Sequence, residues 1–182
     1  TTLFRSFISR NAHDDVFAVP FRVEEDILFE EDNYERTVER EIKNQLLLTE
    51  GDYLKVRIPS IDCILGDKMT AFAPHTTGIP LNGTKDMEVM KQFYDICTLM
   101  EETSDFTDLK KSYERIVKTE IGYRGLDIGR EEVLMDTIQS ALVVGARGKL
   151  SEDEYPSYVQ GARDVRTHIF SENYSPEVAA VR

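Results

Sequence analysis

The sequence predicts an α+β protein in which β-strands come first along the chain and α-helices follow. Apolar residues alternate with charged ones in several segments before residue 60, whereas after it they recur every three or four positions. With 182 residues, 41% hydrophobic and 31% charged, the chain is long enough for one domain or for two small lobes. We therefore expect strands at the N-terminal side and a helical C-terminal half.

Four segments before residue 60 have strand-like patterns. The first two are the run at 16–23 and the Ile-Leu-Phe run that Asp26 begins, which acidic residues bound on both sides. Leu46–Leu48 indicate another strand, and the clearest is Tyr53–Ile58, which Pro59 ends. The acids around Asp26 either solubilise an exposed strand edge or supply a metal ligand, and both interpretations stay open.

A helix-period segment at 61–73 carries the most unusual residue of the chain, Lys68. The apolar stripe of this segment consists of Ile61, Leu65, Met69 and Phe72. Lys68 falls within the stripe, and Ser60 is placed to cap the helix N-terminus. An ammonium group on an apolar face extends to solvent, meets an anion or loses its charge. Lys68 is thus either a lysine at the edge of the core or one that points into a cleft toward a carboxylate or a phosphate.

A second helix is predicted at Asp86–Met100, after a loop at residues 74–80. Its apolar face consists of Val89, Met90, Phe93, Ile96, Cys97 and Met100. Lys91 and Asp95 lie four residues apart on the opposite face, where side chains at that spacing meet. Taken alone, this spacing predicts an ion pair on the helix surface.

Further helices follow to the end of the chain. The first ends at Gly122, and the next closes at Gly145. The apolar face predicted for this second one consists of Val133, Leu134, Thr137, Ile138, Ala141 and Leu142. Ser151 and Glu154 form a capping-box pattern before a third helix, and Ser175 precedes a short terminal one.

A net charge of −12 argues against non-specific nucleic-acid binding, which depends on neutralising phosphates with Lys and Arg. It favours a basic protein partner or metal ions held by carboxylates. Cys63 and Cys97 both lie in apolar helical contexts, which is typical of reduced core cysteines in a cytoplasmic protein. No apolar run approaches the ~20 residues that a membrane span needs, and no leader opens the printed sequence.

The sequence contains neither a GxxxxGK[ST] loop nor a GxGxxG or GxSxG motif. What remains is a carboxylate at Asp26, a lysine at Lys68 and the pair Lys91 and Asp95. Carboxylates that hold a divalent metal, with a lysine on phosphate, are the components of phosphoryl and nucleotidyl transfer.

Three segments resemble the abortive-infection toxin nucleotidyltransferases, the AbiEii/AbiGii family of type IV toxin–antitoxin systems. They are DILFEEDNY, LKVRIPSIDCILGDKMTAFAPHTTGIP and KQFYDICTLME. The resemblance implies a polymerase-β-like nucleotidyltransferase fold with a helical C-terminal lobe. Residues 1–85 would be the remainder of the nucleotidyltransferase core, with its sheet incomplete at the N-terminal side, and residues 86–182 the helical lobe.

The resemblance also implies roles for individual residues. Asp26 would be a metal-binding carboxylate, Lys68 the lysine that contacts the nucleotide, and Asp95 the helix aspartate that completes the catalytic site. Lys91 would be a further nucleotide-binding residue and Asp67 a neighbour of the site. The family's upstream Gly-Ser and D-x-D motifs are absent from the printed sequence, which we therefore expect to be the C-terminal portion of a longer enzyme.

The function so implied is a Mg²⁺-dependent transfer of a nucleotidyl group from an NTP to an RNA or protein acceptor. The enzyme would be the toxin of a toxin–antitoxin pair, and the net charge of −12 favours a basic antitoxin. Two alternatives stay open. The chain is a catalytically inactive module of the same fold that binds a nucleotide or a partner, or Lys68 and Asp95 form a purely structural ion pair between two helices.

Overall fold

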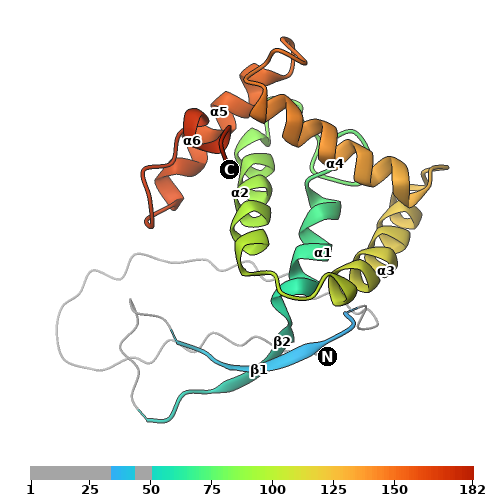
Figure 1. The fold of residues 1–182 in the computed structure, drawn as a ribbon, viewed down its shortest axis with the longest axis vertical. Helices are drawn as coiled ribbons and strands as arrows, with labels where there is room; N and C mark the ends of the chain where they lie inside the picture. The colour runs from blue at the N-terminus through green and yellow to red at the C-terminus, as the bar shows by residue number, and fades with distance from the viewer. Residues whose placement is uncertain (1–33, 44–50) are drawn as a thin grey trace, which may run out of the picture. The chain divides into compact units, whose positions relative to one another are not determined.

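The computed structural model describes residues 34–43 and 51–182, which belong to one compact unit, Asn33–Arg182. This part of the chain is mostly helical and contains a small antiparallel sheet of two strands, so the predicted α+β class is confirmed (Figure 1). The strands predicted at residues 16–23, after Asp26 and at Leu46–Leu48 lie outside the described residues. The predicted lobe boundary after residue 85 stays a prediction.

The sheet is a pair of short strands, β1 (Thr37–Glu41) and β2 (Lys55–Pro59). They run antiparallel, with Thr37 opposite Pro59 at one end of the register. Strand β2 is the clearest strand of the sequence analysis. It begins two residues later than predicted, at Lys55 opposite Glu41, and it includes Pro59, which was expected to end it and instead pairs with Thr37. It leads directly into the first helix.

Helix α1 (Ile61–Ala71) begins where the sequence predicts it. The hydroxyl oxygen of Ser60 accepts a hydrogen bond from the Cys63 N–H at 3.4 Å, which satisfies one of the free donors of the first turn. In the same turn Asp62 is buried and accepts hydrogen bonds from the guanidinium of Arg36 (3.1 Å) and the N–H of Ser104 (3.0 Å). Asp62 thereby ties β1 and the segment before α3 to the start of α1.

Two long helices follow, α2 (Asp86–Glu102) and α3 (Phe106–Arg124). Helix α3 approaches α1 closely at Gly66, where an added Cβ would lie 2.8 Å from the carbonyl oxygen of Leu109. Helix α3 does not end at Gly122 as predicted. It continues to Arg124 and is capped by Gly125, whose φ of 62° is the left-handed conformation that closes a helix without steric cost in glycine.

The chain then forms α4 (Arg130–Gly145) and α5 (Tyr155–Val165), the 3₁₀ turn η1 (Arg166–His168) and the short helix α6 (Pro176–Ala179). The terminal helix behind Ser175 is confirmed, with its hydroxyl accepting from the Val178 N–H at 3.3 Å. The predicted capping box before α5 is wrong. Glu154 itself precedes the helix, and its carboxylate lies on His75 instead.

The face that α4 turns inward also differs from the prediction. Its buried residues are Val133, Asp136, Thr137, Ser140, Val143 and Val144. Ile138 and Leu142, predicted to be buried, are exposed. The prediction assumed that apolar residues decide the inward face, but here buried polar side chains find hydrogen-bond partners inside the protein.

Helix α1 lies between α2 and α3, with the two strands at its N-terminal end (Figure 1). The larger core cluster joins α1, α2, α4, α5 and α6 and consists of Phe72, Val89, Met90, Phe93, Val143, Val144, Tyr158, Ala162, Val165, Tyr174 and Ala179. A smaller cluster lies between α3 and α4 beside α1 and consists of Ala73, Tyr113, Val117 and Val133. Within the described ranges, none of the helices has the length and apolarity required to span a membrane.

Candidate functional site

Lys68 and Asp95, the two predicted catalytic residues, lie side by side although 27 residues separate them in the sequence. The Nζ of Lys68 is 2.9 Å from Oδ2 of Asp95, and the two side chains are 26% and 28% exposed. The pair joins α1 to α2 at a position that both helices leave partly exposed. The ion pair between the two helices that one of the alternatives required is therefore present.

Gln92 is a third member of this site, and the sequence analysis did not single it out. Its Oε1 accepts a hydrogen bond from the Lys68 ammonium at 2.9 Å. It lies one helical turn before Asp95 on α2, so both acceptors face α1 from the same side. The spacing of three residues between Gln92 and Asp95 is visible in the sequence. It would have identified Gln92 as a second acceptor for Lys68 if the prediction had placed Lys68 at the interface between α1 and α2.

Lys91 does not join this cluster. It is exposed on α2, and among the described residues it forms no ion pair with Asp95, four positions later. Asp95 pairs with Lys68 instead, because an ammonium at the edge of a helix interface is less hydrated and more ordered than one on a free surface. The surface pair predicted from spacing is therefore wrong.

Asp67 directly precedes Lys68 in the sequence. Its carboxylate accepts a hydrogen bond from the hydroxyl of Tyr34 at 3.0 Å. Burial raises the pKa of Asp67, and the Tyr34 hydrogen bond and the nearby charge of Lys68 only partly oppose this. The site thus holds one carboxylate paired with Lys68 and a second whose charged form is disfavoured by desolvation.

The described residues by themselves do not fit a magnesium ion. Asp26, the predicted metal ligand, lies outside them, and within the ranges that the structure describes no three His, Cys, Asp or Glu side chains are arranged to hold a metal ion. The carboxylate of Asp95 is occupied by the Lys68 ammonium. A divalent ion prefers several free oxygen ligands, which this pair does not offer.

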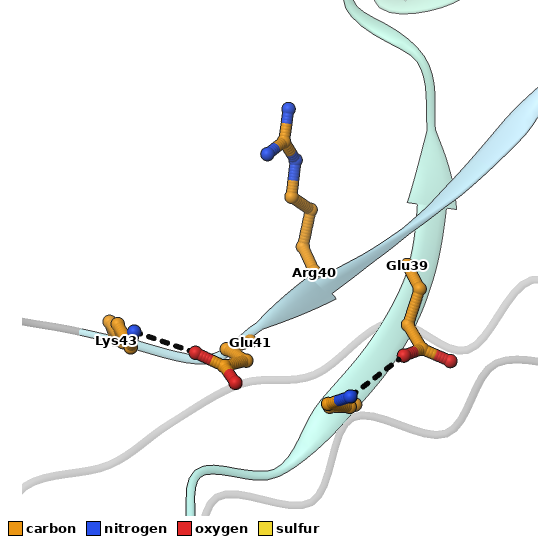
Figure 2. Close-up of a pocket in the computed structure, with 5 residues that line it drawn as sticks. Glu39, Arg40, Glu41 and Lys43 are labelled. Atoms are coloured by element: carbon orange, nitrogen blue, oxygen red, sulfur yellow. Dashed lines mark ion pairs between the residues drawn. The ribbon is translucent and has the colours of Figure 1, made fainter.

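Three surface hollows of about 400, 430 and 420 Å³ occur among the described residues, and Lys68 lines none of these three. Figure 2 shows the first, beside the two strands, where Glu39 pairs with Lys55 at 3.2 Å and Glu41 with Lys43 at 2.6 Å. Arg40 extends away from both pairs. Exposed pairs of this kind contribute little, and we assign no site to this hollow.

A second polar cluster lies around His75, in the loop after α1. Its Nδ1 is 2.6 Å from Oδ1 of Asp136, and its Nε2 is 2.8 Å from Oε1 of Glu154. The buried carboxylate of Asp136 also accepts hydrogen bonds from the His75 N–H (2.9 Å) and from the hydroxyl of Thr76 (2.8 Å). His75 therefore bridges α4 and the start of α5, which gives the loop a structural role.

The same loop closes the end of α1. The buried hydroxyl of Thr77 donates to the Thr70 carbonyl at 2.9 Å, and the Gly78 N–H donates to the Ala73 carbonyl at 2.7 Å. A Cβ at Gly78 would lie 2.4 Å from the Ala73 nitrogen, so this tight loop requires glycine. The Pro74–Pro80 segment thus fixes the end of the helix that carries Lys68.

We expect the stability of the protein to depend on the protonation of His75. Burial lowers the pKa of His75, but the hydrogen bonds to Asp136 and Glu154 outweigh it and hold the pKa above its ordinary value of 6.5. The stabilisation is complete below the unfolded-state pKa and is lost as pH rises through the folded-state pKa. Denaturant unfolding should therefore give a lower free energy of unfolding at pH 8 to 9 than at pH 6.

The variant His75→Gln should lose this pH dependence, whereas the control His168→Gln, at an exposed histidine of η1, should keep it. Equal slopes of stability against pH for wild type and His75→Gln would contradict the prediction.

Both cysteines were predicted to be core residues, and this is confirmed for Cys63, whereas Cys97 lies half-buried at the edge of the core. Cys63 is fully buried, and both thiols are free. Burial raises the pKa of Cys97 to about 11, so this thiol stays protonated and unreactive near neutral pH.

Comparison with protein-family models, with curated proteins and with solved structures found no match to this chain. The resemblance to the AbiEii/AbiGii family therefore rests on three sequence segments of this chain alone.

Proposed function

We propose that this chain is part of a metal-dependent nucleotidyltransferase, the toxin of a toxin–antitoxin pair, in which Lys68 contacts the triphosphate of an NTP. The fold proposed for the enzyme is the polymerase-β-like nucleotidyltransferase fold with a helical C-terminal lobe. The acceptor is an RNA or a protein, and the setting is cytoplasmic. The proposal rests on the contacts by which Asp95 and Gln92 of α2 hold the Lys68 ammonium.

An ammonium group has three N–H donors, and two of those on Lys68 are directed at Asp95 and Gln92. Within the described part of the chain the third donor has no partner, and the side chain is 26% exposed. Two acceptors on one helix fix the direction of the third N–H, which suits it to a phosphate oxygen. Asp95 and Gln92 would then position Lys68.

Mg²⁺ belongs to this proposal through Asp26, its proposed ligand, and the family resemblance implies that further carboxylates would hold the ion. When bound with the nucleotide, the ion would offset the charge of the triphosphate. Lys91, exposed on α2, would contact the nucleotide only from outside the Lys68 cluster. The net charge of −12 suits a basic antitoxin.

The alternative is a catalytically inactive module of the same fold, and it is favoured by the Lys68 ammonium that already occupies the Asp95 carboxylate at 2.9 Å. Such a module would bind a nucleotide or a partner at Lys68 without transferring anything. A purely structural role of the Lys68–Asp95 pair is the third possibility. Nucleotide labelling and a double-mutant cycle together separate all three.

The intact gene product should label itself or an added RNA when it is incubated with Mg²⁺ and each NTP in turn, radioactive at the α-phosphate. We expect Lys68→Ala to abolish labelling, because it removes the proposed phosphate contact. Lys110, one of the exposed lysines of α3, offers a matched control, and Lys110→Ala should label like the wild type. Nucleotide binding without labelling would favour the inactive module, and no binding of any NTP would overturn the proposal.

A double-mutant cycle between Lys68 and Asp95 tests the structural alternative. A partly exposed pair contributes about 0.2–1 kcal/mol, so Lys68→Ala, Asp95→Ala and the double variant should all unfold within about 1 kcal/mol of the wild type. The labelling loss would then be a functional effect. A coupling energy above about 2 kcal/mol would show that the pair holds the fold together.

A further inference from the structure

The two ring nitrogens of His75 both contact carboxylates. Nδ1 lies 2.6 Å from Oδ1 of Asp136 in α4, and Nε2 lies 2.8 Å from Oε1 of Glu154, just before α5. An ionised carboxylate only accepts hydrogen bonds, and a neutral imidazole carries a single N–H. Both contacts are therefore hydrogen bonds only while His75 is an imidazolium with a proton on each ring nitrogen.

Deprotonation must break one of the two contacts, and their surroundings decide which. The Asp136 side chain is 5% exposed and also accepts hydrogen bonds from the backbone N–H of His75 at 2.9 Å and the hydroxyl of Thr76 at 2.8 Å. The Glu154 side chain is 35% exposed, and within the described part of the chain its carboxylate has no hydrogen-bond partner other than His75. The remaining proton should therefore stay on Nδ1, where it serves the buried carboxylate. Nε2 then directs a lone pair at the Glu154 carboxylate, and this contact is lost.

The other titratable groups around this contact do not replace the lost attraction. The phenol of Tyr158 in α5 is buried, and burial raises its pKa to about 12, so it stays neutral. Glu152 and Asp153 are exposed and directly precede Glu154 in the sequence. These three consecutive carboxylates repel one another once the imidazolium no longer offsets their charge. Loss of the contact therefore favours movement of this acidic segment away from the ring.

Glu154 is the last residue of the connection between α4 and α5, residues 146–154. This connection turns through Arg147 and Gly148, whose φ angles of 53° and 81° lie in the left-handed region. A hollow of about 420 Å³ lies beside it and is lined by residues of α4, by Leu150 and Ser151 of the connection, and by His75 and Glu154. The contact between His75 and Glu154 thus ties the connection to the loop after α1 beside this hollow.

We propose that the His75–Glu154 contact is a pH-operated latch on the connection between α4 and α5. While His75 is an imidazolium, the latch is closed and Glu154 holds the connection in place. When Nε2 loses its proton to water, Glu154 is released and the connection moves away from the ring, which opens the hollow. Asp136 holds His75 in both states, so the loop that ends α1 does not move with the connection.

The direction of the switch follows from the charge that the cluster favours. Burial lowers the pKa of His75, but the hydrogen bonds to the two carboxylates outweigh this and hold the pKa above its ordinary value of 6.5. The latch is therefore closed below pH 6.5 and opens as the pH rises through the pKa of the folded state.

The first test identifies the proton that leaves. Nitrogen-15 NMR of the imidazole distinguishes the two neutral forms, because protonated and unprotonated ring nitrogens have well-separated chemical shifts. At about pH 9, well above the ordinary histidine pKa, we expect His75 to keep its proton on Nδ1. The exposed His168 of η1 provides an internal reference without this preference. A proton on Nε2 of His75 would mean that the Asp136 contact breaks instead, and it would overturn the proposal.

The second test measures the opening of the connection. Lys149 is exposed there and is a cleavage site for trypsin. We expect cleavage after Lys149, relative to the isolated peptide of residues 144–154, to be about three- to tenfold faster at pH 9 than at pH 6. The peptide corrects for the pH dependence of trypsin itself. Cleavage after the exposed Lys118 of α3, corrected in the same way, should not rise. No rise after Lys149, or an equal rise at both sites, would overturn the proposal.

Variants of Glu154 separate the latch from other effects of pH. Glu154→Gln should protect the connection at both pH values, because an amide accepts from the imidazolium and donates to the neutral ring. Glu154→Ala should be cleaved rapidly at both. Asp153→Ala, at an exposed neighbour, is the matched control and should keep the pH dependence of the wild type. A Glu154→Gln variant that still opens at pH 9, or an Asp153→Ala variant that does not, would contradict the latch.

Discussion

Replacing Gly161 by alanine is expected to lower the free energy of unfolding by about 3 kcal/mol. Helix α5 approaches the start of α2 at this position, and an added Cβ would lie 2.1 Å from the carbonyl oxygen of Asp86 and 2.6 Å from its carbonyl carbon. Both atoms belong to the backbone of a helix start, so neither can move without shifting α2 against α5. Urea or guanidinium unfolding followed by circular dichroism measures the loss.

Gly122 provides a control of the opposite sign. It lies within α3, is exposed, and has no atom within 4 Å of an added Cβ. Alanine there should raise stability by about 0.5–1 kcal/mol, because it reduces the backbone entropy of the unfolded chain. If Gly161→Ala unfolded at the same denaturant concentration as Gly122→Ala, the close approach of α5 to α2 would be contradicted.

Replacing Asp136 by alanine is expected to cost about 3 kcal/mol as well, but for an electrostatic reason. The carboxylate is 5% exposed and accepts hydrogen bonds from the backbone and ring of His75, from Thr76 and from Ser140. Its removal leaves several donors without an acceptor at the place where the loop after α1 meets α4. A hydrogen bond to a charged group contributes about 1.5–3 kcal/mol, and a buried donor without a partner adds a desolvation cost.

Two controls separate this mechanism from a general effect of losing an acid. Asp164→Ala, at an exposed position of α5, should change stability by less than about 0.5 kcal/mol. Asp136→Ala should also weaken the pH dependence assigned to His75, because the carboxylate is one of the two groups that raise the pKa of His75 and only Glu154 remains in the variant. A stable Asp136→Ala variant with unchanged pH dependence would contradict this account of the cluster.

The helical half of the fold could be predicted because local rules and tertiary packing agree there. The apolar stripe of α1 and the cap at Ser60 were both visible in the sequence, and the structure buries Leu65 and Phe72 and forms the cap. The same agreement holds for the terminal helix behind Ser175. In these elements the hydrophobic spacing and the cap residue point to one structure.

Helix α4 shows where such rules fail. Spacing favoured Ile138 and Leu142 as inward residues, yet the helix is rotated so that Asp136 and Ser140 are buried. Their burial depends on His75 and Thr76, some 60 residues earlier in the sequence. No local pattern contains these partners, and Glu154 likewise lies on the other ring nitrogen of His75 and not in the predicted capping box.

The sequence predicts part of the candidate site, and long-range contacts determine the rest. The sequence by itself determined that Lys68 lies on an apolar face and that Asp95 and Lys91 share a helix surface. Only the tertiary structure decided that Asp95, with Gln92, takes the ammonium of Lys68 while Lys91 stays in solvent. The physical reason is that periodicity specifies which side of a helix is apolar, whereas the partner of a charged group depends on how two helices meet.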